Sequence, residues 1–197
     1  SHVTGYWFLD SDEFWEPPAE LVTFLAAGAA PVYVGFGSMG AQDARHATNL
    51  VLEAIRKSKT RAILATGWGG LSNLELPEIS EGIHMLESAP HDWLFPQCSA
   101  VVHHGGAGTT GAGLRAGKPT IICPFFGDQP FWGKQIYKLG VGPRPIPQKH
   151  LSADGLGQAI QEAIADSKMR QCAESVGKKI RAEDGVAQAV EIVKRYM

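Results

Sequence analysis

Cysteine is scarce in this sequence, and no part of it concentrates charge of one sign. The 197 residues include three cysteines, Cys98, Cys123 and Cys172, with no C-x-x-C pair. An odd number at wide spacing argues against a disulfide framework and a zinc site, and it fits a reducing compartment. The formal net charge is −2, and the 18 Lys and Arg residues are scattered. Because there is no basic field, a nucleic acid partner is not expected.

Long hydrophobic runs are also missing. The longest, residues 21–36, is broken by Gly28 and Pro31, so it cannot form a membrane span. No secretory signal peptide is recognisable, which favours a cytoplasmic location. Hydrophobic residues make up 44% of the chain and charged residues 19%, which is ordinary for a globular protein. This composition and length predict a single domain with a real core, to which Cys123 should belong.

Apolar segments alternate with helical patterns along most of the chain. Strands are predicted at residues 32–36, 62–65, 83–86, 100–103 and 120–123. Helices are predicted at residues 19–27, 43–58, 107–116, 129–139, after Ser152 as N-cap, 167–182 and 185–196. This order predicts an α/β fold, a single Rossmann-like domain with a parallel sheet flanked by helices. Ligands bind at the carboxyl ends of such strands, so the loops there should form the site.

The first of these loops is glycine-rich. Residues 35–40, Gly-Phe-Gly-Ser-Met-Gly, form a G-x-G-x-x-G sequence between a predicted strand and a predicted helix. One interpretation is a dinucleotide fingerprint, which needs an acidic residue at the end of the next strand to hold the ribose. That strand instead ends in residues 65–68, Ala-Thr-Gly-Trp, and Glu53 lies within a helix. The NAD interpretation is therefore disfavoured, and loop glycines without a ligand remain a second alternative.

A second glycine-rich loop spans residues 103–111, His-His-Gly-Gly-Ala-Gly-Thr-Thr-Gly. Glycines let the backbone approach a ligand, and a helix N-terminus presents free N–H groups and a positive dipole. The hydroxyls of Thr109 and Thr110 add donors. A tight turn for packing would explain one glycine, but not four with two threonines. Two such loops on one sheet predict a diphosphate between them.

The paired histidines need separate roles. Successive residues of a strand point to opposite faces, so His103 and His104 cannot both face a ligand. A metal pair is implausible because adjacent residues rarely chelate one ion and no third ligand is near. One histidine is expected in the core. His104 is next to the glycine turn and is assigned to phosphate.

Asp128 and Gln129 follow the last predicted strand, at the start of a helix. The aspartate there has a simple structural interpretation as a helix cap. The pair can instead grip sugar hydroxyls, since a carboxylate accepts two hydrogen bonds and an amide both donates and accepts. A separate acidic motif, Asp10-Ser11-Asp12, has the D-x-D form of a metal-binding triplet. It precedes every predicted strand, so we do not interpret it as a metal site.

Residues 88–129 closely resemble the donor-binding signature of UDP-glycosyltransferases with the GT-B fold. The matching positions are His104, Gly106, Gly108, Thr109, Gly117, Pro119, Pro124, Asp128 and Gln129. The form of residues 103–110 is similar to the fungal and bacterial branch. Residues 4–7, 90–95 and 125–129 look most like sterol 3-beta-glucosyltransferases. The resemblance covers essentially the whole chain.

The resemblance implies a role for each matching residue. Diphosphate binding is assigned to Ser38, His104, Gly106, Gly108, Thr109 and Thr110. The donor sugar, UDP-glucose by resemblance, is assigned to Asp128 and Gln129. The uracil and ribose are assigned to Trp68, Ser88 and Ala89, with Trp68 as a stacking wall. Two departures leave the nucleoside contacts open: Ala112 stands where the plant form has a ribose-binding Glu, and Ser88 where it has a Trp.

The resemblance also implies that half of the enzyme lies outside this sequence. GT-B enzymes have two Rossmann-like domains, and the acceptor pocket and catalytic base belong to the N-terminal one. We therefore expect no catalytic residue here and an N-terminal acceptor-binding domain as partner. Residues 1–18 are predicted to be an interdomain linker, 19–182 the nucleotide-sugar-binding domain, and 183–197 a C-terminal helix that crosses back.

The implied reaction is an inverting, metal-independent hexosyl transfer without a cofactor. A lipid-like acceptor such as a sterol would bring the full-length protein to a membrane surface as a peripheral protein. Two alternatives stay open. One is a transferase with a polyketide, peptide or other small acceptor, and the other is a non-catalytic nucleotide-sugar-binding module.

Overall fold

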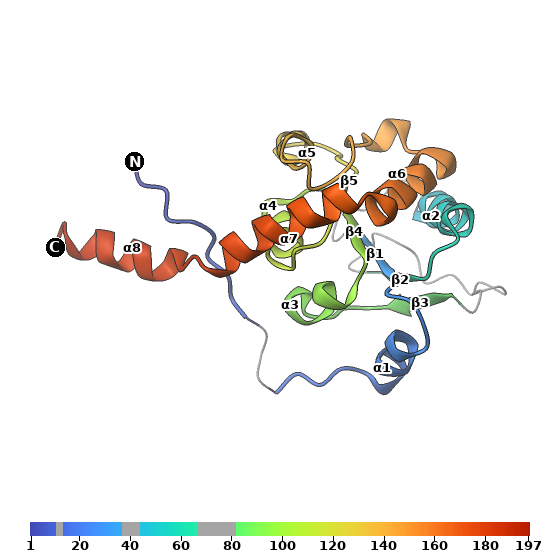
Figure 1. Cartoon of the computed structure of the whole chain (residues 1–197), viewed down its shortest axis with the longest axis horizontal. Coiled ribbons are helices and arrows are strands. Elements are labelled where there is room, and N and C mark those ends of the chain that lie inside the picture. Colours follow the sequence, from blue (N-terminus) through green and yellow to red (C-terminus); the bar gives the residue numbers. More distant parts are fainter. Residues whose placement is uncertain (11–13, 37–43, 67–81) are drawn as a thin grey trace.

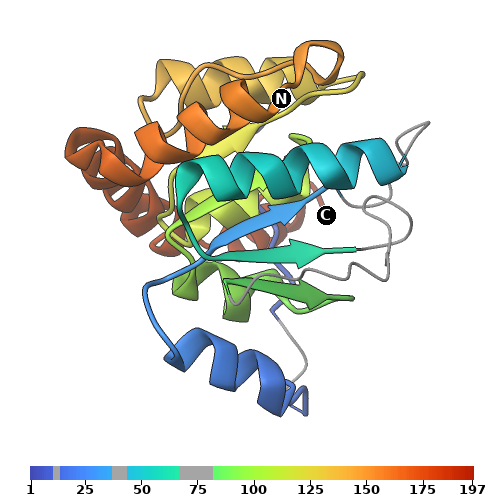
Figure 2. The same ribbon diagram turned by 90° about the vertical axis from the view of Figure 1, so that its right-hand side faces the viewer.

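Five parallel strands form a single sheet. The computed structural model describes residues 1–10, 14–36, 44–66 and 82–197. The strands are β1 (Val32–Gly35), β2 (Ala62–Ala65), β3 (Ile83–Leu86), β4 (Ala100–His103) and β5 (Thr120–Ile122). Their order in the sheet is β3-β2-β1-β4-β5, and every pairing is parallel. Figure 2 shows β1, β2 and β3 side by side with their arrowheads pointing the same way. All five predicted strands and the predicted fold class are confirmed.

Helices cover both faces of this sheet (Figure 1). They are α1 (Ala19–Ala26), α2 (Ala44–Ser58), α3 (His91–Leu94), α4 (Ala107–Arg115), α5 (Gln129–Lys138), α6 (Ala153–Ala165), α7 (Ser167–Arg181) and α8 (Gly185–Lys194). Two 3-10 turns are also present, η1 (Phe95–Gln97) and η2 (Gln148–His150). Ser152 caps α6 as predicted, since its hydroxyl accepts a hydrogen bond from the Gly155 N–H at 3.2 Å. The short α3 and both 3-10 turns were not predicted.

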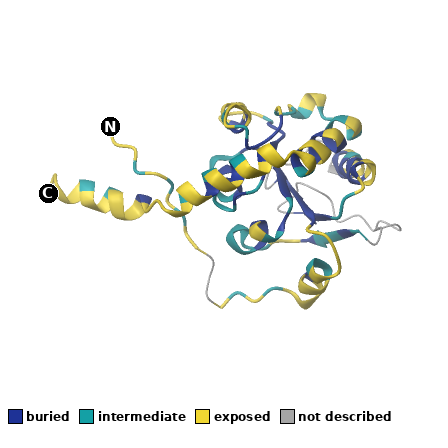
Figure 3. Cartoon of the chain, viewed as in Figure 1, coloured by how far each residue is buried: buried dark blue, intermediate teal, exposed yellow. Residues whose placement is uncertain are grey.

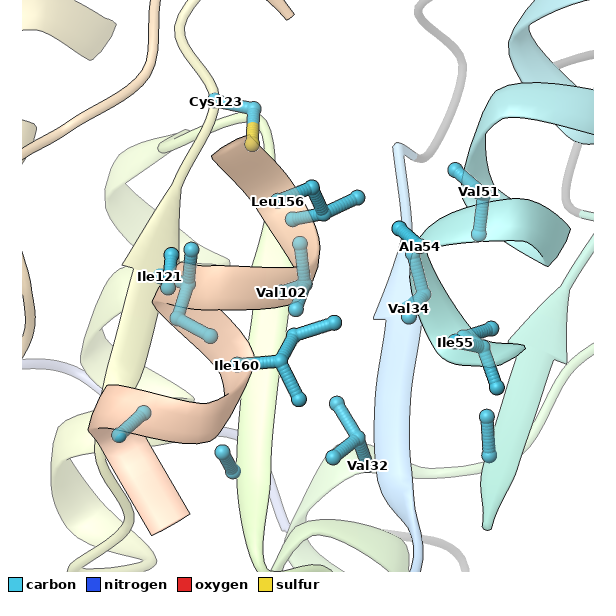
Figure 4. Packing of buried hydrophobic residues seen from close by; sticks show 14 of the residues in the cluster. Val32, Val34, Val51, Ala54, Ile55, Val102, Ile121, Cys123, Leu156 and Ile160 are labelled. Atoms are coloured by element: carbon cyan, nitrogen blue, oxygen red, sulfur yellow. The ribbon is translucent and has the colours of Figure 1, made fainter. Parts of the chain in front are cut away.

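Alternation along the strands divides the core into two layers. Val32 and Val34 of β1 point to one face, where they pack with α2 and α6 (Figure 4). Tyr33 points to the other face and packs with Leu21 of α1 and Leu94 of α3. Cys123 is fully buried in the first layer, as predicted. The three cysteines are free thiols, and burial raises the pKa of Cys98 and Cys123 to about 12.

The two ends of the chain meet away from the sheet. Residues 1–10 form neither helix nor strand, and α8 projects beside them beyond the body of the fold (Figure 1). The His2 ring lies 3.3 Å from the Tyr196 hydroxyl, and the two rings are 6.2 Å apart. Most residues of both segments are exposed, unlike those of the sheet (Figure 3). Among the described residues, no helix is both long and apolar enough to cross a bilayer.

Candidate functional site

The sheet has a topological switch point between β1 and β4. These strands are neighbours, with Gly35 opposite His103. The helix after β1, α2, packs on one face of the sheet. The helix after β4, α4, contributes Ala112 to the layer on the other face, where its C-cap residue Ala116 also packs. The helices that follow β1 and β4 therefore lie on opposite faces of the sheet, and in such sheets nucleotide ligands bind at the strand ends where this change occurs. Ser38 and Trp68, predicted to bind phosphate and uracil, lie outside the described residues.

His103 and His104 take different positions at this switch point. His103 is fully buried, and its Nδ1 accepts a hydrogen bond from the Gly105 N–H at 2.9 Å. Burial, with charge repulsion from His104 and His91, lowers the pKa of His103 to about 3. A ring that is neutral at every physiological pH suits this acceptor role. His103 is thus the core histidine of the pair, and it shapes the loop that follows.

His104 is half-buried and faces the start of α4. Its Nε2 lies over Gly106, where an added Cβ would sit only 2.6 Å away. Its Nδ1 is buried without a hydrogen-bond partner in the described part of the chain. Burial lowers the pKa of His104, and the carboxylate of Asp128 acts in the opposite direction. The ring is therefore mainly neutral at pH 7, and the tautomer with its proton on Nε2 can donate a hydrogen bond towards the helix start.

The turn between β4 and α4 depends on glycine. Gly105 has φ +94°, and a Cβ on it would lie 2.6 Å from Cγ2 of Ile122. Gly106 is the N-cap of α4, and its carbonyl accepts a hydrogen bond from the Thr110 N–H at 2.9 Å. The N–H groups before Thr110 have no intrahelical partner because they precede the first full turn. Gly108 is exposed, and nothing lies within 4 Å of where its Cβ would be. This arrangement offers backbone donors and open space to an anion.

The two threonines of this loop differ in access. Thr109 is half-buried in the first turn of α4. Thr110 has no exposed surface, its N–H is used within the helix, and its hydroxyl has no partner within the described residues. In this conformation Thr110 therefore does not present the donor expected of it. The phase of α4 explains this, because Thr110 faces the interior at the helix start.

Asp128 and Gln129 also divide into an outward and an inward residue. Asp128 is exposed and occupies the N-cap position of α5, but its side chain makes no capping bond there. One oxygen, Oδ2, instead accepts a hydrogen bond from the Trp132 indole N–H at 2.9 Å. Gln129 is only 5% exposed, and its Oε1 accepts from the N–H groups of Phe125 at 2.7 Å and Phe126 at 3.2 Å. In this conformation Gln129 fixes the loop after β5, and Asp128 is the member of the pair that a sugar can reach.

A cavity of about 880 Å³ adjoins the start of α4. Residues that line it include Trp7, His91, Asp92, Gly108, Ala112 and Arg115. The N-terminal segment forms one wall, and Arg115 ties it to α4 through an ion pair with Asp10 at 2.5 Å. Ser88 is exposed and Ala89 half-buried just before α3, next to this cavity in sequence, but neither lines it. Sequence reasoning missed the wall from residues 7–10, because it comes from a segment distant in the chain.

The D-x-D triplet lies mostly outside the described residues. Asp10, its described member, is paired with Arg115. Within residues 1–10, 14–36, 44–66 and 82–197, no three His, Cys, Asp or Glu side chains are grouped so as to hold a metal ion. The structure therefore adds no support to the triplet as a metal site.

A parallel sheet in this strand order, with a glycine turn and a helix start at its switch point, defines a Rossmann-like domain, a class of fold in which this point commonly binds nucleotides. Residues 51–196 match the family model described as "Erythromycin biosynthesis protein CIII-like, C-terminal domain". The chain belongs to this family. The predicted relation to the C-terminal half of GT-B glycosyltransferases is thereby confirmed.

Curated relatives narrow the resemblance. Two sterol 3-beta-glucosyltransferases of Arabidopsis thaliana are 49% and 47% identical over 195 residues. The alignments cover 99% of this chain but only 30% and 31% of those proteins. A sterol 3-beta-glucosyltransferase of Emericella nidulans is 45% identical over 203 residues, with 98% of this chain and 14% of that protein covered. The chain thus spans about a third or less of the relatives it matches.

Solved structures show the same fold at low sequence identity. The glycotransferase of kitacinnamycin superposes with a TM-score of 0.77 at 22% identity, over 97% of this chain and 47% of that one. The calicheamicin glycosyltransferase CalG4 gives a TM-score of 0.72 at 19% identity, over 95% and 45%. In both, this fold occupies about half of a longer chain.

Proposed function

We propose that this chain is the donor-binding domain of an inverting glucosyltransferase that transfers glucose from UDP-glucose to a sterol hydroxyl. The observation that carries the proposal is the start of α4, where open backbone donors and the Nε2 of His104 converge beside Gly106. The identity to sterol 3-beta-glucosyltransferases over 99% of the chain supports the sugar and the acceptor class.

The positions of the described residues support assigning different parts of the donor to different side chains. The diphosphate would lie against the first turn of α4, with Gly106, Gly108 and Thr109 around it and His104 donating from Nε2. Asp128 would accept hydrogen bonds from the sugar hydroxyls. It lies close enough to His104 for its charge to act on the pKa of that ring, which supports placing the sugar next to the diphosphate. The nucleoside would extend towards Ser88, Ala89 and the cavity beside Ala112.

Chemistry at this site would be electrostatic. A base supplied from outside this chain would deprotonate the acceptor hydroxyl, which attacks the anomeric carbon as UDP leaves. Negative charge then grows on the leaving phosphate, where His104 and the helix start would stabilise it. The remainder of the enzyme would supply the acceptor site, and a sterol acceptor would bring the full-length protein to a membrane surface. We expect the domain alone to bind donor and to transfer little or none of it.

Calorimetric titration tests this proposal. The chain should bind UDP and UDP-glucose but not NAD, and EDTA should leave both affinities unchanged. NAD binding without uridine binding would instead favour the dinucleotide interpretation of residues 35–40. Failure to bind any of the three would contradict a donor site formed by this domain alone.

A second candidate is a donor domain for a different acceptor. The kitacinnamycin and calicheamicin glycosyltransferases share the fold, so the fold is compatible with acceptors other than sterols. Transfer assays with the complete protein on sterols and on polyketide acceptors separate the two candidates. A complete protein that binds UDP-glucose and transfers to neither would favour a non-catalytic binding module.

A further inference from the structure

Asp128 is the exposed carboxylate of the candidate donor site, and its side chain is held by a hydrogen bond. The Trp132 indole N–H donates to Oδ2 at 2.9 Å, one helical turn further along α5. Residues four apart on a helix are neighbours on its surface, so this bond forms without a change in the helix backbone. The second oxygen, Oδ1, is left for another partner. An aspartate fixed in this way is already oriented for a ligand before one arrives.

Trp132 is itself held in place by aromatic rings. The ring centroid of Tyr6 lies 6.4 Å from that of Trp132. The ring centroid of Phe131, the preceding residue of α5, lies 5.3 Å from it. Both distances are within the range of favourable aromatic pairs. Trp132 is half-buried, whereas Phe131 is 54% exposed. Of these two rings, Tyr6 is the one from a distant segment, and it connects Trp132 to residues 1–10.

Tyr6 belongs to the N-terminal segment, which is docked on α4. A Cβ on Gly111 would lie 2.6 Å from the Tyr6 ring, so the absence of a side chain there lets the ring approach the helix. Tyr6 stacks on Phe8 with the centroids 5.3 Å apart, and the Arg115 guanidinium lies 4.6 Å above the Phe8 ring. Contacts thus run without a gap from α4 through the N-terminal segment to α5.

We propose that Trp132 is a positioning residue that orients Asp128 towards the donor sugar, and that Tyr6 buttresses it. Recognition of the sugar then depends on how residues 4–10 lie on α4. This inference rests on the proposed function, because it needs Asp128 to contact the sugar. It adds that binding of the sugar, but not of the nucleotide, depends on the Trp132 indole, which lies outside the glycine loops.

The decisive variant is Trp132→Phe, which removes the indole N–H and keeps an aromatic ring. The dissociation constant for UDP-glucose should rise about five- to tenfold, the effect of losing orientation by one hydrogen bond to a charged group. The dissociation constant for UDP should stay within about twofold, because the diphosphate and nucleoside contacts are elsewhere. Trp15→Phe is the matched control, since Trp15 packs against Trp93 at 5.1 Å, away from α5.

Two results would overturn the positioning role. One is an equal loss of affinity for UDP and UDP-glucose, which would make Trp132 a general support of the fold. The other is unchanged binding of both ligands in a folded Trp132→Phe variant. Tyr6→Leu should weaken UDP-glucose binding in the same direction but less. Combined with Trp132→Phe it should add little, because both substitutions act through one contact.

A ligand-free measurement separates this inference from the proposed function. The five tryptophans give five indole N–H resonances, and the one missing in Trp132→Phe identifies Trp132. Asp128→Ala should shift that resonance and speed its exchange with solvent. If it does not move, the contact is absent and the inference fails, whatever the chain binds. If it moves but the wild-type chain binds neither uridine ligand, the proposed function fails and takes the sugar role of Trp132 with it.

Discussion

The loops after β4 and β5 each contain a pair of adjacent residues with different roles, one buried and one more exposed. One residue of each pair is buried and accepts hydrogen bonds from backbone N–H groups of its own loop: His103 after β4 and Gln129 after β5. The other, His104 or Asp128, is more exposed and lies at the candidate site. The inner residue comes first in the β4 pair, which continues a strand, and second in the β5 pair, which begins a helix. In each pair, one side chain thus fixes the shape of the loop, and the other is the one that a ligand can reach.

The inner residues should matter most for stability, and Gln129 most of all. Gln129→Leu removes the buried side-chain acceptor for two backbone N–H groups, whose hydrogen bonds are partly buried. Each unsatisfied group costs about 1–3 kcal/mol, so we expect the free energy of unfolding to fall by about 3 kcal/mol. Urea denaturation followed by circular dichroism measures it. Asp128→Ala is the matched control and should cost about 0.5 kcal/mol, as is usual for an exposed residue. Equal losses of stability in Gln129→Leu and Asp128→Ala would show that the buried and exposed residues after β5 do not differ in structural role.

His103 makes stability depend on pH. Its pKa is about 3 in the folded state, against an ordinary value of 6.5, so below pH 6.5 the unfolded chain binds a proton that the folded chain does not. Stability from this group is complete above pH 6.5 and is lost progressively as the pH falls towards 3. Between pH 7 and pH 5 the loss should be about 2 kcal/mol.

The control for this prediction is His103→Asn, which keeps an acceptor for the Gly105 N–H but cannot titrate. Denaturation at both pH values should show a smaller fall in stability for this variant than for the wild type. The comparison cancels other titrating groups, which both proteins share. Parallel pH curves would show that His103 takes up a proton without unfolding the site, contrary to its buried position.

The outer residues should matter for ligands, and His104 for every uridine ligand. His104→Ala should weaken UDP and UDP-glucose binding alike, by about 2 kcal/mol, because the diphosphate is common to both. Burial lowers the pKa of His104, so the ring is neutral and the loss should be the same at pH 7 and pH 8. Calorimetry at the two pH values measures it. A folded variant with wild-type affinity would remove His104 from the site.

The sequence predicts which residue of the pair is buried after β4, but not which is buried after β5. Strand alternation alone predicts that His103 and His104 face opposite ways, and the glycine turn singles out His104. For Asp128 and Gln129 the sequence predicts a helix start, and the resemblance assigns both residues to the sugar without separating them. Which of the two turns inward depends on the angle at which α5 leaves β5, and that angle is set by packing. The inward position of Gln129 and the bond from Trp132 to Asp128 were therefore not predicted.

The elements themselves show the same limit. Long apolar strands and amphipathic helices were predicted because their periodic patterns extend over several residues. The four-residue helix α3 is too short for such a pattern, and the wall of the cavity from residues 7–10 depends on contacts distant in sequence. The division of the chain into residues 1–18, 19–182 and 183–197 stays a prediction, as do the assigned roles of Ser38 and Trp68.

The smallest expected effect is the most selective one. Asp128→Ala removes a carboxylate that, on the proposed function, contacts only the sugar. Affinity for UDP-glucose should fall about tenfold, the effect of losing a charge-assisted hydrogen bond, while affinity for UDP changes by less than about twofold. Asp128→Asn keeps an acceptor for the Trp132 N–H, so its affinity for UDP-glucose should lie between those of the wild type and Asp128→Ala. Equal losses for UDP and UDP-glucose would make Asp128 structural, and the outer residue of the β5 pair would then differ in kind from His104. A selective loss would instead show that the two loops divide the donor between them, the diphosphate at β4 and the sugar at β5.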